Sequence, residues 1–145
     1  MKLIIYTDGG ARGNQGPAAI GVVIANEKGA AIKKYSQYLG EKTNNEAEYE
    51  AVIFALKKVK ALFGKEKIKK MEIEIRSDSE LITSQLNHQF KIEEENLQKL
   101  FMKIWNALID FDEIKFMYVP REKNKEADRL VNECLGGEAL KQKLI

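Results

Sequence analysis

The sequence has only one cysteine, Cys134, and one histidine, His88, among its 145 residues. A single cysteine cannot form an internal disulfide, so we expect a reducing compartment and a cytoplasmic protein. A single histidine leaves too few imidazole and thiolate groups for a Cys/His zinc site, and it argues against a histidine-dependent catalytic triad. Any chemistry must therefore depend on carboxylates, lysines, hydroxyls or a hard metal ion.

Long apolar runs are also absent. The longest, Ala18 to Ala25 and Ala51 to Leu56, are much shorter than the ~20 residues that a membrane span needs. We therefore expect no membrane partner and no secretory signal. A composition of 44% apolar and 32% charged residues is that of a folded globular protein, and the length suits one core. We expect a single domain over residues 1–145, acting as a monomer.

Positive charge is concentrated in one part of the chain. The net charge is only +2, but the segment from Lys57 to Lys70 holds seven lysines and one acidic residue, Glu66. Such a block can bind a polyanion, or it can be the solvated end of a helix.

Hydrophobic periodicity predicts an α/β protein. Short apolar or alternating segments indicate strands, and apolar residues at helical spacing indicate helices. Tight connections between the first three strands predict an antiparallel meander, and helical crossovers before the later strands predict a mixed sheet with helices on both faces. Trp105 and Cys134 fall on apolar stripes, so we expect both in the core. The expected strands are Lys2–Thr7, Ala18–Ala25, Ala31–Leu39, Met71–Ser77 and Ile114–Val119, and the expected helices are Asn45–Leu62, Ser79–Leu86, Leu97–Ile109 and Ala127–Leu135.

A glycine-rich segment, Asp8 to Pro17, follows the first expected strand. It lacks the spacing of a phosphate-binding loop, and the next element is a strand, so no helix N-terminus would face a phosphate. The glycines therefore indicate a tight connection in which the backbone approaches another element closely. Asp8 is unusual because a carboxylate at the end of a buried strand is costly without a cation or hydrogen bonds.

Three more carboxylates have comparable positions. Asp78 ends the fourth strand, Glu48 lies one turn into the first long helix, and Asp128 lies near the start of the last helix. Ligands of α/β sheets bind outside the strand ends, so these acids can converge, and a divalent cation would relieve their repulsion. An all-oxygen ligand set selects Mg²⁺ or Mn²⁺. Taken singly, each acid also has an ordinary explanation as a helix cap, a dipole partner or a member of an ion pair with Arg129.

Four segments, taken together, resemble type 1 ribonuclease H, in the compact form found in prokaryotes. They occur in the family's order with near-family spacing and span almost the whole chain. The segments are TDGGARGNQGPA (Thr7–Ala18), TNNEAEYEA (Thr43–Ala51), SDSEL (Ser77–Leu81) and REKNKEADRL (Arg121–Leu130).

This resemblance implies the ribonuclease H-like fold, a five-stranded mixed sheet with three antiparallel strands and two that run parallel to the first. It also implies hydrolysis of the RNA strand of RNA/DNA hybrids, which leaves 5′-phosphate and 3′-hydroxyl ends. Two Mg²⁺ or Mn²⁺ ions would activate the attacking water and neutralise the leaving oxygen. The family's catalytic and metal-binding carboxylates fall on Asp8, Glu48, Asp78 and Asp128, with Asp8 as the expected bridge between the ions.

The resemblance also assigns substrate contacts. Asn14, Asn44 and Asn45 fall on the family's contacts to the minor groove and RNA backbone, and Thr43 falls on its DNA phosphate site. Many relatives have a histidine in the loop before the last aspartate, whereas the loop from Val119 to Asp128 has none. Arg121 is the expected partial substitute because it can neutralise phosphate charge.

Two further hypotheses compete with the ribonuclease. A binding module that retains the fold but has lost turnover would explain the missing loop histidine. Several relatives have an arginine where this sequence has Glu41, and this change in the phosphate pocket leaves open a nuclease that acts on double-stranded RNA.

Overall fold

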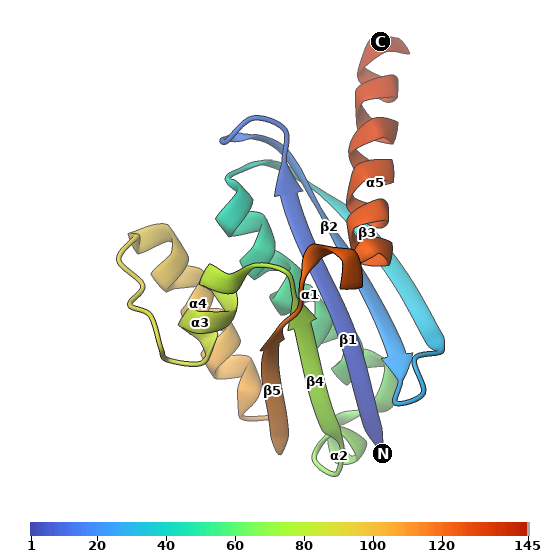
Figure 1. The fold of residues 1–145 in the computed structure, drawn as a ribbon, viewed down its shortest axis with the longest axis vertical. Coiled ribbons are helices and arrows are strands. Elements are labelled where there is room, and N and C mark those ends of the chain that lie inside the picture. Colours follow the sequence, from blue (N-terminus) through green and yellow to red (C-terminus); the bar gives the residue numbers. More distant parts are fainter. Residues whose placement is uncertain (145) are drawn as a thin grey trace.

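A computed structural model describes residues 1–144 as a five-stranded sheet flanked by helices (Figure 1). The strands lie in the order β3-β2-β1-β4-β5. β1 pairs with β2 and β2 with β3 in antiparallel fashion, whereas β4 is parallel to β1 and β5 is parallel to β4. The predicted mixed sheet of three antiparallel and two parallel strands is therefore confirmed. The strands are β1 (Lys2–Ala11), β2 (Gly16–Asn26), β3 (Ala31–Lys42), β4 (Glu72–Ser77) and β5 (Glu113–Tyr118).

The helices are α1 (Asn44–Phe63), α2 (Lys65–Ile68), α3 (Glu80–Leu86), α4 (Glu95–Leu108) and α5 (Lys125–Leu144), with a 3-10 turn at Arg121–Lys123. All the predicted elements are present, and each predicted strand differs from the observed one by only a few residues. The short helix α2 and the continuation of α5 beyond Leu135 were not predicted. No helix in the described part of the chain has the length and apolar character to cross a membrane.

Helices cover both faces of the sheet, as predicted, and two glycines show why they approach so closely. A Cβ atom on Gly9 of β1 would lie 2.3 Å from the backbone of Ala47 in α1, and one on Gly21 of β2 would lie 2.2 Å from the carbonyl oxygen of Ala127 in α5. Gly9 pairs with Ile20 and Gly21 with Asp8, and paired residues share a face of the sheet. α1 therefore packs on one face and α5 on the other, with Asp8 on the α5 face (Figure 1).

The main core lies between the sheet and α1. Leu3, Ile5, Ile73 and Ile75 from β1 and β4 are at most 2% exposed, and they pack with the buried side of α1. A smaller cluster under α5 contains Ala19, Val131 and Leu135, with Cys134 half-buried against it.

The prediction that Trp105 belongs to the core was wrong, since its side chain is 63% exposed. α4 packs against α1 rather than between two layers, so only a narrow stripe of it is buried. Leu97 and Ile104 fill that stripe, whereas Trp105 is one residue beyond it and faces outward with Met102 and Ile109. The helical periodicity was correct, but it overestimated the width of the buried face. Cys134, also predicted in the core, is at its margin.

Candidate active site at the ends of β1 and β4

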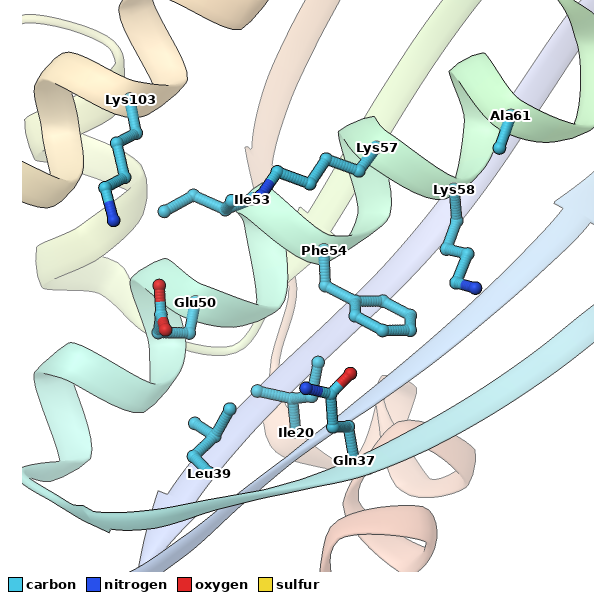
Figure 2. Close-up of a pocket in the computed structure, with 10 residues that line it drawn as sticks. All are labelled: Ile20, Gln37, Leu39, Glu50, Ile53, Phe54, Lys57, Lys58, Ala61 and Lys103. Carbon is cyan, nitrogen blue, oxygen red and sulfur yellow. The ribbon is translucent and has the colours of Figure 1, made fainter.

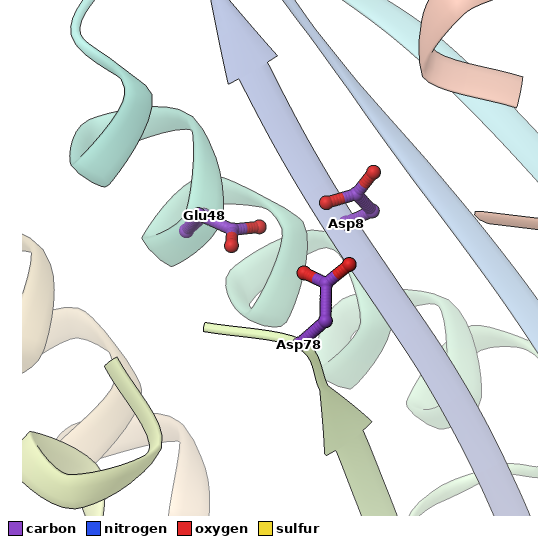
Figure 3. A group of neighbouring side chains, drawn as sticks. All are labelled: Asp8, Glu48 and Asp78. Atoms are coloured by element: carbon purple, nitrogen blue, oxygen red, sulfur yellow. The ribbon is translucent and has the colours of Figure 1, made fainter. Parts of the chain in front are cut away.

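Three predicted carboxylates meet at the ends of the two central parallel strands. Asp8 lies in β1, Asp78 directly follows β4, and Glu48 lies in the second turn of α1. One carboxylate oxygen from each side chain lies within 4.8 Å of the others. Figure 3 shows the three side chains turned toward one another, and they come from elements far apart in the sequence.

Glu48 reaches the sheet because α1 packs directly on Gly9. Its Oε1 accepts a hydrogen bond of 2.6 Å from the Gly9 backbone N–H. The absence of a side chain at Gly9 makes this contact possible, since a Cβ there would overlap the backbone of Ala47. The prediction that the glycines permit a close approach is correct for Gly9.

Asp128 approaches the group from the opposite side. It lies in the first turn of α5, and its negative charge adds to burial and to the charge of Asp78 in raising the pKa of Asp8. Asp128 also lines the same open pocket of about 530 Å³ as the other three carboxylates. The structure thus gathers all four predicted acids around one pocket, with Asp128 outside the tight group of three.

The carboxyl groups of Asp8, Glu48 and Asp78 have raised pKa values, as expected for clustered acids with little positive charge nearby. Burial raises the pKa of Asp8 to about 8, and the charges of Asp78 and Asp128 add to this effect. Burial and the neighbouring Asp8 raise the pKa of Glu48 well above its usual value. Burial also raises the pKa of Asp78, although the positive charge of Arg121 acts in the opposite direction. Clustered oxygen donors with raised pKa values fit a hard divalent cation, which would replace the protons.

Two of the ordinary explanations, a helix cap for Asp78 and an ion pair with Arg129 for Asp128, do not hold. The N-cap of α3 is Ser79, whose hydroxyl accepts from the Ile82 N–H, so Asp78 is free of that role. Arg129 pairs with Glu126 and Glu133 rather than with Asp128.

Glu46 does have an ordinary role. The N–H of Thr43 donates to Glu46 Oε1 and the N–H of Glu46 donates to Thr43 Oγ1, at 2.9 and 3.1 Å, which forms a capping box at the start of α1. This backbone hydrogen bond lowers the pKa of the Glu46 carboxyl. Glu46 is therefore a structural residue, and the box fixes the first turn of the helix that carries Glu48.

The predicted substrate-contact residues lie around the same pocket. Asn44, Asn45 and Arg121 line it. The N–H of Ala11 donates to Asn44 Oδ1 at 2.8 Å, and the N–H of Asn44 donates to Asn14 Oδ1 at 2.9 Å. These bonds tie the glycine-rich turn to the start of α1 and leave both side-chain NH₂ groups as donors.

Asn124 was not among the predicted site residues, yet it is buried beside the carboxylates and donates to the carbonyl oxygen of Thr7. Its position shortly before the last helix was the one available signal. His88 is not among the residues that line the carboxylate pocket; it lies after α3 and lines a separate hollow with Phe90.

A second pocket, of about 480 Å³, lies between α1 and strands β2 and β3 (Figure 2). Lys57 and Lys58 from the basic block line it together with Lys103. Further along the block, Lys60 and Lys65 pair with Asp110 at 2.7 and 3.8 Å. One part of the basic block therefore lines a pocket, and another part pairs with Asp110, which follows α4.

Comparison with known proteins gives a consistent result. The sequence profile of the family described as "Reverse transcriptase-like" matches residues 6–134. The chain is 38% identical over 130 residues to ribonuclease HI of Halobacterium salinarum, which corresponds to 90% of this chain and 62% of that protein. It spans 37% of a bifunctional protein of Mycobacterium tuberculosis, to which it is 33% identical.

Solved structures match over nearly their full length. The structure of LC11 ribonuclease H1 in complex with an RNA/DNA hybrid superposes with a TM-score of 0.90 at 48% identity, over 94% of this chain and 99% of that one. The N-terminal ribonuclease H domain of the M. tuberculosis protein superposes with a TM-score of 0.86 at 32% identity, over 97% and 98% of the two chains.

Proposed function

The chain belongs to the type 1 ribonuclease H family, and we propose that it is a metal-dependent endoribonuclease that hydrolyses the RNA strand of RNA/DNA hybrids. The products would carry 5′-phosphate and 3′-hydroxyl ends. The observation that carries the proposal is the meeting of Asp8, Glu48 and Asp78, whose oxygens lie within 4.8 Å of one another. A relative of 48% identity binds an RNA/DNA hybrid, which supports this substrate class.

Asp8, Glu48, Asp78 and Asp128 would hold two Mg²⁺ or Mn²⁺ ions. When bound, the ions supply an activated water and a counter-charge for the leaving 3′-oxygen. The protein's part is to hold the carboxylates in place: the Gly9 N–H fixes one oxygen of Glu48. Arg121 lines the same pocket and would neutralise phosphate charge, which supports its role in place of the missing loop histidine.

Substrate recognition would use the amide groups at the start of α1. The NH₂ groups of Asn14, Asn44 and Asn45 can donate to 2′-hydroxyl and sugar oxygens, which distinguish RNA from DNA without reading its sequence. Thr43 would contact a phosphate of the DNA strand, since its hydroxyl accepts from Glu46 and retains its own proton for donation.

The four carboxylates, Asn44, Asn45 and Arg121 belong to one chain and line one pocket, which supports a single domain over residues 1–145 that acts as a monomer. The single cysteine supports a cytoplasmic location, where disulfides are rare.

The decisive test is hydrolysis of a labelled hybrid. Cleavage should occur with Mg²⁺ or Mn²⁺, stop with a chelator, and be lost in Asp8→Asn and Asp78→Asn, while Asp112→Asn, a change at an exposed residue after α4, stays active. Full cleavage by either site variant would refute the proposal. Tight hybrid binding without cleavage with either metal would instead identify a binding module.

The same assay on duplex RNA and duplex DNA tests the alternative substrate. Glu41 in place of an arginine motivates the comparison, because it weakens the expected phosphate pocket. Cleavage of duplex RNA as fast as the hybrid would broaden the proposed specificity.

A further inference from the structure

We propose that Asn124 is the positioning residue of this site: its side-chain amide and its backbone fix the end of β1 and the start of α5 relative to one another, beside Asp78 at the end of β4, and so hold the carboxylates in one geometry. The inference rests on the proposed function and deepens it. Asn124 is only 1% exposed, and it lies between the 3-10 turn at Arg121–Lys123 and α5.

The amide group contacts the end of β1 and lies beside Asp78 at the end of β4. Asn124 Nδ2 donates to the carbonyl oxygen of Thr7, at 2.9 Å. The same side chain is near enough to Asp78 to lower the pKa of that carboxyl, against the larger effect of burial, which raises it. Thr7 directly precedes Asp8, and Asp78 directly follows β4, so this one amide group lies next to two of the predicted ligands.

The orientation of this amide follows from its acceptors. With the NH₂ group toward the Thr7 carbonyl oxygen the contact is attractive, whereas turning the amide over would point Oδ1 at that oxygen. In the observed orientation Oδ1 is buried and has no hydrogen-bond partner among the described residues. A buried, unsatisfied acceptor is unfavourable, and such groups in folded proteins call for a functional explanation. Here the requirement for a donor to the residue before Asp8 explains it.

The backbone of Asn124 connects the third element. Its carbonyl oxygen accepts from the Asp128 N–H at 3.2 Å, in the first turn of α5, and its N–H donates to the Arg121 carbonyl oxygen at 2.9 Å. The side chain of Asn124 therefore anchors the residue that directly precedes α5. In this way it helps to place both Asp128 and Arg121.

The test compares Asn124→Ala and Asn124→Leu with the wild type and with Asn87→Ala. Asn87 is the matched control, because its Nδ2 also donates to a strand carbonyl oxygen, that of Phe116, at 2.9 Å, but away from the carboxylates. The leucine side chain has the same branching and number of heavy atoms as asparagine and lacks the amide, so this variant keeps the test valid if the alanine variant does not fold. Folding is measured by urea denaturation, Mn²⁺ affinity by calorimetry, and hydrolysis on the hybrid.

In both Asn124 variants we expect Mn²⁺ affinity and kcat to fall about 10–100-fold, the usual effect of losing a group that orients metal ligands, with KM for the hybrid changed less than about threefold. Asn87→Ala should leave the Mn²⁺ affinity, kcat and KM unchanged. Wild-type Mn²⁺ affinity and kcat in a folded Asn124 variant would overturn the inference. If the wild type binds Mn²⁺ but cleaves no hybrid, the proposed function fails, while the change in Mn²⁺ affinity still tests the role of Asn124.

Discussion

Replacing Asp8 by asparagine should stabilise the metal-free protein while it abolishes cleavage. Asp8 is only 7% exposed, and burial together with Asp78 and Asp128 raises its pKa from 3.8 to about 8. The native state therefore binds this proton more tightly than the unfolded chain does. As pH rises from 4 to 8, the unfolded chain loses the proton first, and the stability that the protonated carboxyl contributes is lost.

The size of the effect follows from the pKa shift. Each pKa unit corresponds to about 1.4 kcal/mol, so a rise from 3.8 to about 8 sets an upper limit of roughly 6 kcal/mol on this loss. Water and small ions enter an open pocket and reduce the cost of the charge, so we expect about 2–3 kcal/mol. Asparagine is neutral at every pH and avoids that cost.

Urea denaturation in the presence of a chelator, between pH 4 and pH 8, measures this difference. Asp8→Asn and the wild type should have similar free energies of unfolding near pH 4, and the variant should be the more stable by about 2–3 kcal/mol at pH 8. Asp112→Asn, at an exposed position, controls for a general effect of removing one negative charge. A variant that is no more stable than the wild type at pH 8 would refute the claim that Asp8 lies in an uncompensated anionic cluster.

Three further predictions concern the elements around the site. Gly9→Ala should lower the free energy of unfolding by about 3 kcal/mol and reduce kcat at least tenfold, because a Cβ would displace α1 and with it Glu48. Gly10→Ala is the control, since its Cβ would meet its nearest neighbour at 3.6 Å. It should have little effect on urea denaturation or hydrolysis. Thr43→Ala should cost about 1 kcal/mol, a fall of roughly 3 °C in Tm, and Thr43→Ser should restore most of it; an unchanged Tm would contradict the role of the capping box. Saturating Mn²⁺ should raise Tm more at pH 8 than at pH 5, because protons compete for the carboxylates at the lower pH; an equal increase at both would contradict the raised pKa values.

Most of the fold was predictable because each element has its own local pattern. The alternation of Met71, Ile73 and Ile75, the stop at Gly64 and the turn at Asn26–Gly29 depend on neighbouring residues only, and all three are present. The topology then follows from the short connections and the helical crossovers.

The burial of single side chains was less predictable, because it depends on what packs against an element. Trp105 lies on an apolar stripe as clearly as Ile104 does, yet it makes an edge-on contact with Phe101 and is otherwise largely exposed. Asn124 shows the opposite case, since it stands between two lysines in a polar segment. It is buried only because the folded chain places this segment against the ends of β1 and β4. Periodicity carries no information about either contact.

Likewise, the residue types predicted the four acids of the site, but not their separate roles. Glu46 and Glu48 are only two residues apart near the start of α1. Only the structure shows that Glu46 caps the helix while Glu48 reaches Gly9. That division depends on the angle at which α1 crosses β1, which no local pattern encodes.

The order of the acids along the chain has a consequence for synthesis on the ribosome. Asp8, Glu48 and Asp78 precede Asp128, and α5 packs across β1, β2 and β3 only after the rest of the sheet has been made. A nascent chain that ends before Asn124 lacks both the final acid and the residue that orients it. The proposed four-carboxylate site is therefore complete only after α5 has been synthesised and has packed on the sheet.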